Sequence, residues 1–83
     1  MSETIFVTGA TGRIGTPLVR KLVADGHTVR CLVRSSAGEA SIKALGCEPI
    51  RGDLDDSEAL RRGVVGADAV FHLAGGILSL IHI

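Results

Sequence analysis

The chain has 83 residues, which is enough for one small domain. It carries 9 lysine and arginine residues against 9 aspartate and glutamate residues, and this zero net charge argues against a nucleic acid or an anionic membrane as a partner. No apolar run approaches the roughly 20 residues of a membrane-spanning helix, and no signal peptide is recognisable. We therefore expect a cytoplasmic protein in which Cys31 and Cys47 are buried free thiols.

Segments with strand-like and helix-like spacing alternate along the chain. The first strand, Thr4 to Thr8, is apolar at successive positions, which is typical of a strand with both faces covered. A helix follows from residue 12 or 13, with an apolar stripe at every fourth position, and Gly26 ends it. The later segments are a strand over 28–34, a helix from 36 closed by Gly46, a strand over 47–51, a helix from about 55 ended by Gly66 and a strand over 67–74.

Local signals indicate where some of these segments begin and lie. Ser36 with Glu39, and Asp55 with Glu58, have the spacing of a capping box, in which the first residue caps a helix N-terminus. Pro49 predicts that the third strand lies at a sheet edge, because proline cannot donate a hydrogen bond to a neighbouring strand.

The alternation of strands and helices predicts an α/β fold. We expect four parallel strands with right-handed crossovers and the order 3-2-1-4, which is a truncated part of a doubly wound Rossmann sheet. In such a sheet the ligand crevice lies beyond the C-terminal ends of strands one and four. The residues expected to be buried are Ile5, Val7, Leu18, Leu22, Val29, Leu32, Val70 and Phe71.

Three glycines separate the first strand from the first helix with G-x-x-G-x-x-G spacing: Gly9, Gly12 and Gly15. Glycines allow a tight turn and the close approach of a phosphate, and a helix N-terminus offers unpaired N–H groups to an anion. This position favours a dinucleotide site over the alternative, a turn that only brings helix and sheet together. A flavin is a weaker alternative, because flavin fingerprints favour G-x-G-x-x-G.

Four motifs resemble those of the extended and atypical short-chain dehydrogenase/reductases, in particular their NmrA-like and NAD(P)-binding epimerase-type branches. The motifs are Thr8-Gly-Ala-Thr-Gly-Arg-Ile-Gly15, Val29-Arg-Cys-Leu-Val-Arg34, Gly52-Asp53-Leu54 and Phe71-His-Leu-Ala-Gly75. The resemblance covers residues 3 to about 76. It implies that the glycine loop contacts the pyrophosphate and nearby ribose of the cofactor through Gly9, Thr11, Gly12, Arg13, Ile14 and Gly15.

The later motifs imply further contacts with the cofactor. By the same resemblance Asp53 and Leu54 border the adenine, whose amino group would donate to the Asp53 carboxylate. Ala74 and Gly75 would pass beside the pyrophosphate and the nicotinamide ribose. The alternative for Asp53 is a local role, in which its carboxylate caps a turn.

Arg34 predicts NADP rather than NAD as the cofactor. At this position, near the end of the second strand, NAD sites carry an acid for the ribose hydroxyls and NADP sites supply an arginine for the 2′-phosphate. No acidic residue occurs between Val29 and Ser36, and a guanidinium binds phosphate bidentately. The alternative is that Arg34 is a solvated residue at a strand end.

The chain offers no evident catalytic group. Members of this superfamily that transfer hydride use a Tyr-x-x-x-Lys pair, and the chain contains no tyrosine. We interpret His72 as a packed neutral histidine, and the histidines and cysteines show no metal-ligand spacing. Two hypotheses follow: the N-terminal part of an NADP-dependent oxidoreductase or epimerase, and an NmrA-like dinucleotide-sensing protein without catalysis.

The end of the chain differs in character from the rest. Residues 78–83 form an apolar run with no cap, helical stripe or turn residue. They back-translate to CTG TCT CTT ATA CAC ATC, a string that resembles a transposase adapter used to prepare sequencing libraries. We therefore expect residues 1–77 to be the N-terminal part of an NAD(P)-binding Rossmann domain and residues 78–83 to be adapter sequence, with a natural short strand or a truncated gene as alternatives.

Overall fold

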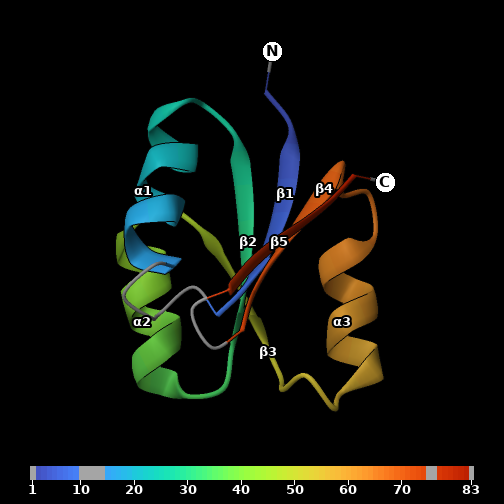
Figure 1. Ribbon diagram of the computed structural model, residues 1–83. Helices are drawn as coiled ribbons and strands as arrows, with labels where there is room; N and C mark the ends of the chain where they lie inside the picture. The colour runs from blue at the N-terminus through green and yellow to red at the C-terminus, as the bar shows by residue number, and fades with distance from the viewer. Residues whose placement is uncertain (1, 10–14, 75–76, 83) are drawn as a thin grey trace.

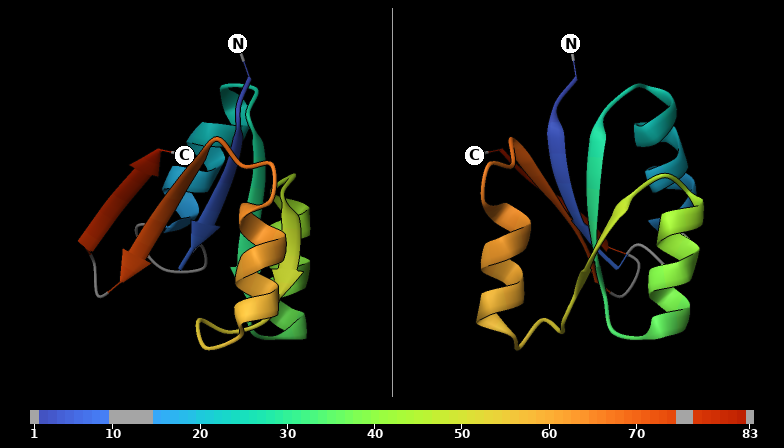
Figure 2. Two further views of the ribbon diagram at one scale, coloured as in Figure 1. Left: turned by 90° about the vertical axis from the view of Figure 1, so that its right-hand side faces the viewer. Right: turned by 180° about the vertical axis from the view of Figure 1, so that it is seen from behind.

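The computed structural model describes residues 2–9, 15–74 and 77–82, and within these ranges the chain forms a sheet flanked by helices (Figure 1). In chain order the elements are β1 (Thr4–Thr8), α1 (Gly15–Ala24), β2 (Thr28–Val33), α2 (Ser36–Ala44), β3 (Glu48–Arg51), α3 (Ser57–Val64), β4 (Ala69–Ala74) and β5 (Ile77–His82). α1 and α2 lie on one face of the sheet and α3 lies on the other, as the further views in Figure 2 show.

The described strands lie in the order β3-β2-β1-β4-β5. β1 pairs in parallel with β2 and with β4, and β2 pairs in parallel with β3, which confirms the predicted order 3-2-1-4. β3, which contains Pro49, lies at a sheet edge as predicted. The register pairs Val7 with Cys31 and Thr8 with His72, so the C-terminal ends of β1, β2 and β4 lie together at one end of the sheet.

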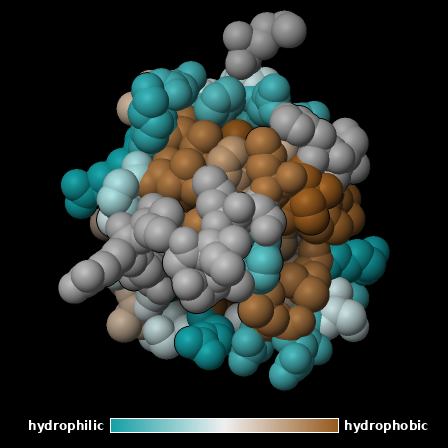
Figure 3. Space-filling model, viewed as in Figure 1, coloured by the Kyte–Doolittle hydropathy of each residue, from teal (hydrophilic) through white to brown (hydrophobic). Residues whose placement is uncertain are grey.

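β5 is an addition to the four strands that the sequence predicted. It pairs antiparallel with β4, with Ala74 opposite Ile77 and Ala69 opposite His82. The outer edge of β4 offers unpaired N–H and C=O groups, and an apolar segment that follows closely in the chain satisfies them as an antiparallel neighbour. Figure 3 shows apolar side chains gathered on the face of the molecule across which β5 runs in Figure 1.

Two apolar clusters form the core, one on each face of the sheet. The cluster under α1 and α2 includes Val7, Val29 and Ile42. The cluster under α3 includes Phe6 and Leu32. This division confirms that β1 is covered on both faces, as its continuous apolar sequence predicted, and it shows that β2 is covered on both faces as well.

Burial agrees with the prediction on the central strands and falls short of it toward β4. Of the residues predicted to be buried, Leu18, Val70 and Phe71 are only partly buried, and the others are buried. Among the described residues, the main helix contacts are with β1, β2 and β3 rather than with β4. Side chains on β4 therefore keep part of their surface exposed, and Leu18 packs at the margin of its cluster.

The N-terminal caps of α2 and α3 each differ by one residue from the prediction. Ser35 rather than Ser36 caps α2, because its backbone is extended and its Oγ accepts a hydrogen bond from the N–H of Gly38 at 3.1 Å. Asp56 rather than Asp55 caps α3, and its carboxylate accepts from the N–H three residues later at 3.1 Å. A capping residue must stay non-helical while its side chain reaches that N–H, and only these residues meet both conditions here.

Small shifts also occur at the ends of strands. Residues 34, 47 and 67–68 were predicted to lie in strands and lie just outside β2, β3 and β4. Gly26, with φ of 88°, follows α1 and confirms the predicted end of that helix, whereas its predicted start at residue 12 or 13 lies outside the described residues. No helix in the described ranges has the length and hydropathy needed to cross a membrane.

Candidate functional site

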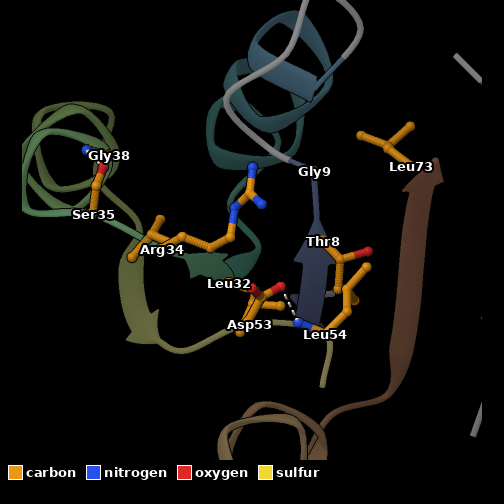
Figure 4. Close-up of a pocket in the computed structure, with 10 residues that line it drawn as sticks. Thr8, Gly9, Leu32, Arg34, Ser35, Gly38, Asp53, Leu54 and Leu73 are labelled. Carbon is orange, nitrogen blue, oxygen red and sulfur yellow. Dashed lines mark hydrogen bonds between the residues drawn. The ribbon is translucent and has the colours of Figure 1, made fainter. Parts of the chain in front are cut away.

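A pocket of about 340 Å³ opens at the C-terminal ends of β1 and β2 (Figure 4). Its lining residues come from the ends of these strands, the start of α2, the loop after β3, and β4. They are Thr8, Gly9, Leu32, Val33, Arg34, Ser35, Gly38, Asp53, Leu54 and Leu73. This is the region where the strand order reverses around β1, and in doubly wound sheets such a switch point is where ligands bind.

The structure brings four predicted site residues together in this pocket: Gly9, Arg34, Asp53 and Leu54. Two others lie on neighbouring elements: Gly15 is buried at the first position of α1, and Ala74 is the last residue of β4. The other predicted positions, Thr11, Gly12, Arg13, Ile14 and Gly75, lie outside the described residues.

Gly9 makes the turn by which the chain leaves β1. Its φ of 79° is in the left-handed region, which favours glycine. A Cβ built at this position would lie 2.5 Å from the carbonyl oxygen of Leu73, so a side chain has no room there. The glycine therefore allows the end of β1 and the end of β4 to approach closely at the pocket.

Arg34 is the first residue after β2, and its exposed side chain extends across the pocket toward the end of β1 in Figure 4. Other arginines are engaged by the protein: Arg30 donates to the carbonyl of Gly63 at 3.1 Å, and Arg61 pairs with Glu58 at 3.0 Å. By contrast, Arg34 has no hydrogen-bond or ion-pair partner among the residues that the structure describes. It is a cation held at a pocket and available to an anion.

Asp53 and Leu54 form the opposite side of the pocket, in the loop between β3 and α3. The Asp53 Oδ1 accepts a hydrogen bond from the N–H of Leu54 at 2.7 Å, which is drawn in Figure 4. This is the local turn-capping contact that the sequence left open as an alternative, and it occupies one of the two carboxylate oxygens. The side chain of Leu54 is 50% exposed and supplies apolar surface. The arrangement suits a flat, apolar group that carries a hydrogen-bond donor at its edge.

Ser35 and Gly38 line the pocket and were not predicted from the sequence. Ser35 accepts from the Gly38 N–H, so its own O–H, which has no acceptor among the described residues, is available to a ligand. The signal was the position of Ser35 directly after Arg34 at a strand end. It was missed because the cap of α2 was assigned one residue too late. Thr8, Leu32, Val33 and Leu73 were missed as well, and each adjoins a predicted strand end.

The remaining reactive groups lie away from the pocket. Cys31 and Cys47 are free and buried, as predicted. Burial raises the pKa of both thiols, which keeps them protonated and unreactive. In the described part of the chain, no cluster of three or more histidine, cysteine, aspartate or glutamate side chains is placed to hold a metal ion. The described residues of the pocket offer groups for binding: the Arg34 cation, hydroxyl groups, the Asp53 carboxylate and apolar surface.

Two reductases are similar in sequence to this chain. The chain is 46% identical over 69 residues to 4-hydroxy-2-methyl-3-oxo-4-farnesyl-3,4-dihydroquinoline-1-oxide ketoreductase of Stigmatella aurantiaca, covering 83% of this chain and 21% of the relative. It is 46% identical over 68 residues to 2-alkyl-3-oxoalkanoate reductase of Stenotrophomonas maltophilia, covering 82% of this chain and 20% of the relative. The chain thus spans about a fifth of the length of these relatives.

Solved structures show the same arrangement of elements. AtPrR2 with NADP+ and (+)pinoresinol superposes with a TM-score of 0.77 at 27% identity, over 93% of this chain and 27% of that one. Isoflavone reductase gives a TM-score of 0.76 at 26% identity, over 94% of this chain and 29% of that one. The NmrA-like family itself matches residues 1–82. The chain belongs to the NmrA-like family, whose members resemble the extended short-chain dehydrogenase/reductases, as its motifs predicted.

Proposed function

We propose that this chain is the NADP(H)-binding half-site of a short-chain dehydrogenase/reductase-type oxidoreductase or epimerase. The observation that carries the proposal is the Arg34 guanidinium, which has no partner among the described residues and lies in a pocket bordered by the Gly9 turn. An exposed cation at this place suits a phosphate, and the turn next to it allows a ligand to approach the main chain.

Different residues of the pocket suit different parts of an adenine dinucleotide. Leu54 supplies apolar surface for the adenine, and the other carboxylate oxygen of Asp53 would accept from its amino group. Arg34 and the hydroxyl of Ser35 would bind the phosphate on the adenosine ribose. The pyrophosphate would lie toward Gly15 at the N-terminus of α1, where helical N–H groups stabilise an anion.

NADP is favoured over NAD by the residues that follow β2. Positions 32–35 read Leu-Val-Arg-Ser, so the pocket has no acid there to hold two ribose hydroxyls and to repel a 2′-phosphate. The similar structure of AtPrR2 was determined with NADP+, which supports the same choice.

The reaction belongs to the longer protein rather than to this stretch. The relatives named above are reductases about five times longer than the aligned region, and this chain contains no tyrosine for a Tyr-x-x-x-Lys pair. The second candidate is a dinucleotide sensor without catalysis, which is favoured by the binding groups that the described residues bring to the pocket. A Tyr-x-x-x-Lys pair in the downstream part of the same gene would favour the oxidoreductase or epimerase over the sensor.

The test compares NADPH and NADH binding to the chain through the fluorescence of the reduced nicotinamide. Arg34→Gln should weaken NADPH binding by about 10- to 100-fold, since a hydrogen bond to a charged group contributes about 1.5–3 kcal/mol. NADH binding should change little. Arg20→Gln, which removes the same charge from an exposed site on α1, is the matched control. Equal losses for both cofactors, or no binding by the wild-type chain, would contradict the proposal.

A further inference from the structure

Thr8 and His72 form a hydrogen bond beside the pocket. The Thr8 Oγ1 lies 2.6 Å from the His72 Nδ1, although the two residues are 64 positions apart in the chain. They are register partners in the parallel pair of β1 and β4, at the last position of β1. Thr8 is only 4% exposed, so its hydroxyl depends on a protein partner, and His72 supplies it.

The contact depends on one nitrogen of the imidazole. Nδ1 accepts the Thr8 O–H in one tautomer and donates to the Thr8 oxygen in the other, and either arrangement makes a hydrogen bond. Nε2 has no partner among the residues that the structure describes. An amide side chain can therefore replace the histidine only if it places a polar atom where Nδ1 lies.

The residues that follow Thr8 and His72 in the chain connect this hydrogen bond to the pocket. Gly9 follows Thr8, Leu73 follows His72, and a Cβ built on Gly9 would lie 2.5 Å from the Leu73 carbonyl oxygen. A hydrogen bond and, one residue later, a close approach that leaves no room for a side chain thus join the same two strand ends where the chain turns away from β1. Thr8, Gly9 and Leu73 line the pocket, whereas His72 does not.

We propose that His72 is a positioning residue of the cofactor site. Its Nδ1 holds the Thr8 side chain and the end of β1 against β4, and through them it sets the position of the Gly9 turn. The inference rests on the proposed function, because the ligand that this turn would approach is the dinucleotide. It also gives a defined partner to a histidine that the sequence indicated only as a packing residue.

The test uses two amides that differ in reach. Asparagine carries its amide atoms on Cγ, as histidine carries Nδ1, whereas glutamine places them one carbon further out, near the position of Nε2. The dissociation constant of NADPH is measured for the wild-type chain, His72→Asn, His72→Gln and Thr8→Val, and for the double variant Thr8→Val with His72→Gln. The melting temperature of each variant is measured in parallel.

His72→Gln and Thr8→Val should each weaken NADPH binding by about tenfold, which corresponds to the loss of one hydrogen bond. His72→Asn should recover most of this loss, and the double variant should bind no more weakly than either single one. NADH binding should fall by the same factor, because the contact does not involve the 2′-phosphate. A selective loss of NADPH binding would instead assign His72 to phosphate recognition and overturn the inference.

Other outcomes also separate the two proposals. If the asparagine and glutamine variants bind equally well, or if the two single effects multiply in the double variant, Nδ1 does not position Thr8 and this inference is wrong while the proposed function stands. Lower melting temperatures with unchanged dissociation constants would show a role in stability alone and overturn it as well. No NADPH binding by the wild-type chain would overturn the proposed function, and this inference with it.

Discussion

Gly63 of α3 lies directly against the ring of Phe6 on β1. A Cβ built on Gly63 would come within 2.4 Å of the ring atoms Cε1 and Cζ. Among the described residues Phe6 is the largest fully buried side chain, with 1% of its surface exposed, so the ring is enclosed by its neighbours. The missing side chain at position 63 therefore decides how closely α3 packs on the sheet.

Gly63→Ala should destabilise the chain in spite of its position in a helix. Alanine in place of glycine contributes about 1 kcal/mol to a helix, while overpacking of a core costs about 1–3 kcal/mol. A fixed aromatic ring at 2.4 Å places this site at the upper end of that range, so the free energy of unfolding should fall by about 1–2 kcal/mol in urea denaturation. Gly38→Ala in α2 is the control, because its Cβ would meet nothing closer than 3.4 Å. Equal stability of the two variants would contradict the packing argument.

Gly9→Ala should be more damaging than Gly26→Ala, although both glycines have similar φ values of 79° and 88°. The left-handed backbone alone costs a residue with a side chain about 1–2 kcal/mol, and Gly26 has open space around it, so its substitution measures that cost. Gly9→Ala adds a clash with the Leu73 carbonyl, which is main chain and cannot rotate away. Denaturation in urea should show a clearly larger loss for Gly9→Ala, together with a loss of NADPH binding. Similar losses in the free energy of unfolding for the two variants would show that the end of β4 shifts to make room for the added methyl group, and this would contradict the prediction.

The buried thiols should make the fold less stable in alkaline solution. Burial raises the pKa of Cys31 and of Cys47 in the folded chain, so their thiols stay protonated there while those of the unfolded chain ionise near pH 8.5. A group whose pKa is raised by folding stabilises the fold below its unfolded pKa, and this contribution is lost as the pH rises above it. The free energy of unfolding should therefore fall above about pH 8.5, by up to about 1.4 kcal/mol per pH unit for Cys31, and Cys47 should act in the same direction.

Cys31→Val provides the control for this prediction, because it keeps an apolar side chain of similar size on β2 and removes the group that titrates. The variant should show a shallower decline in stability than the wild-type chain between about pH 8.5 and 10. The same decline in both proteins would assign the effect to other groups. Alkylation of Cys31 in the folded wild type should also be slow, since the thiolate is the reactive form.

The sequence predicted those parts of the fold that depend on short-range signals. Strand, turn and helix patterns located every element up to β4, and the strand-end rule brought Gly9, Arg34, Asp53 and Leu54 to one pocket. The cap of α2 was misplaced by one residue because Ser35 and Ser36 carry the same side chain, and backbone geometry alone distinguishes them.

Features that depend on distant contacts were not predictable in this way. The hydrogen bond between Thr8 and His72 follows from the register of β1 and β4, which the composition of neither strand reveals. The partial exposure of Val70 and Phe71 reflects which strands the helices cover. A strand pattern records that a side chain is apolar, and it carries no information on whether a helix lies above it.

β5 fits the sheet less well than the other strands do. A doubly wound sheet continues beyond its fourth strand through a helix into a parallel neighbour, whereas β5 is antiparallel to β4. Successive residues of a strand point to opposite faces, and both Leu80 and Ile81 are about half exposed, at 48% and 56%. Both of these side chains thus keep about half of their surface exposed, whereas strands of such sheets are covered on both faces.

These features support the hypothesis that residues 78–83 come from adapter sequence. The apolar run pairs with β4 because an uncovered strand edge accepts an apolar segment of any origin. We predict that the codons of Leu78 to Ile83 read CTG TCT CTT ATA CAC ATC, and that the uninterrupted gene departs from this sequence after about Ile77 and encodes a helix and a parallel strand there. Sequencing the locus from the source DNA without a transposase step is the measurement. Different codons for these residues, within a longer genomic sequence, would show that β5 is native.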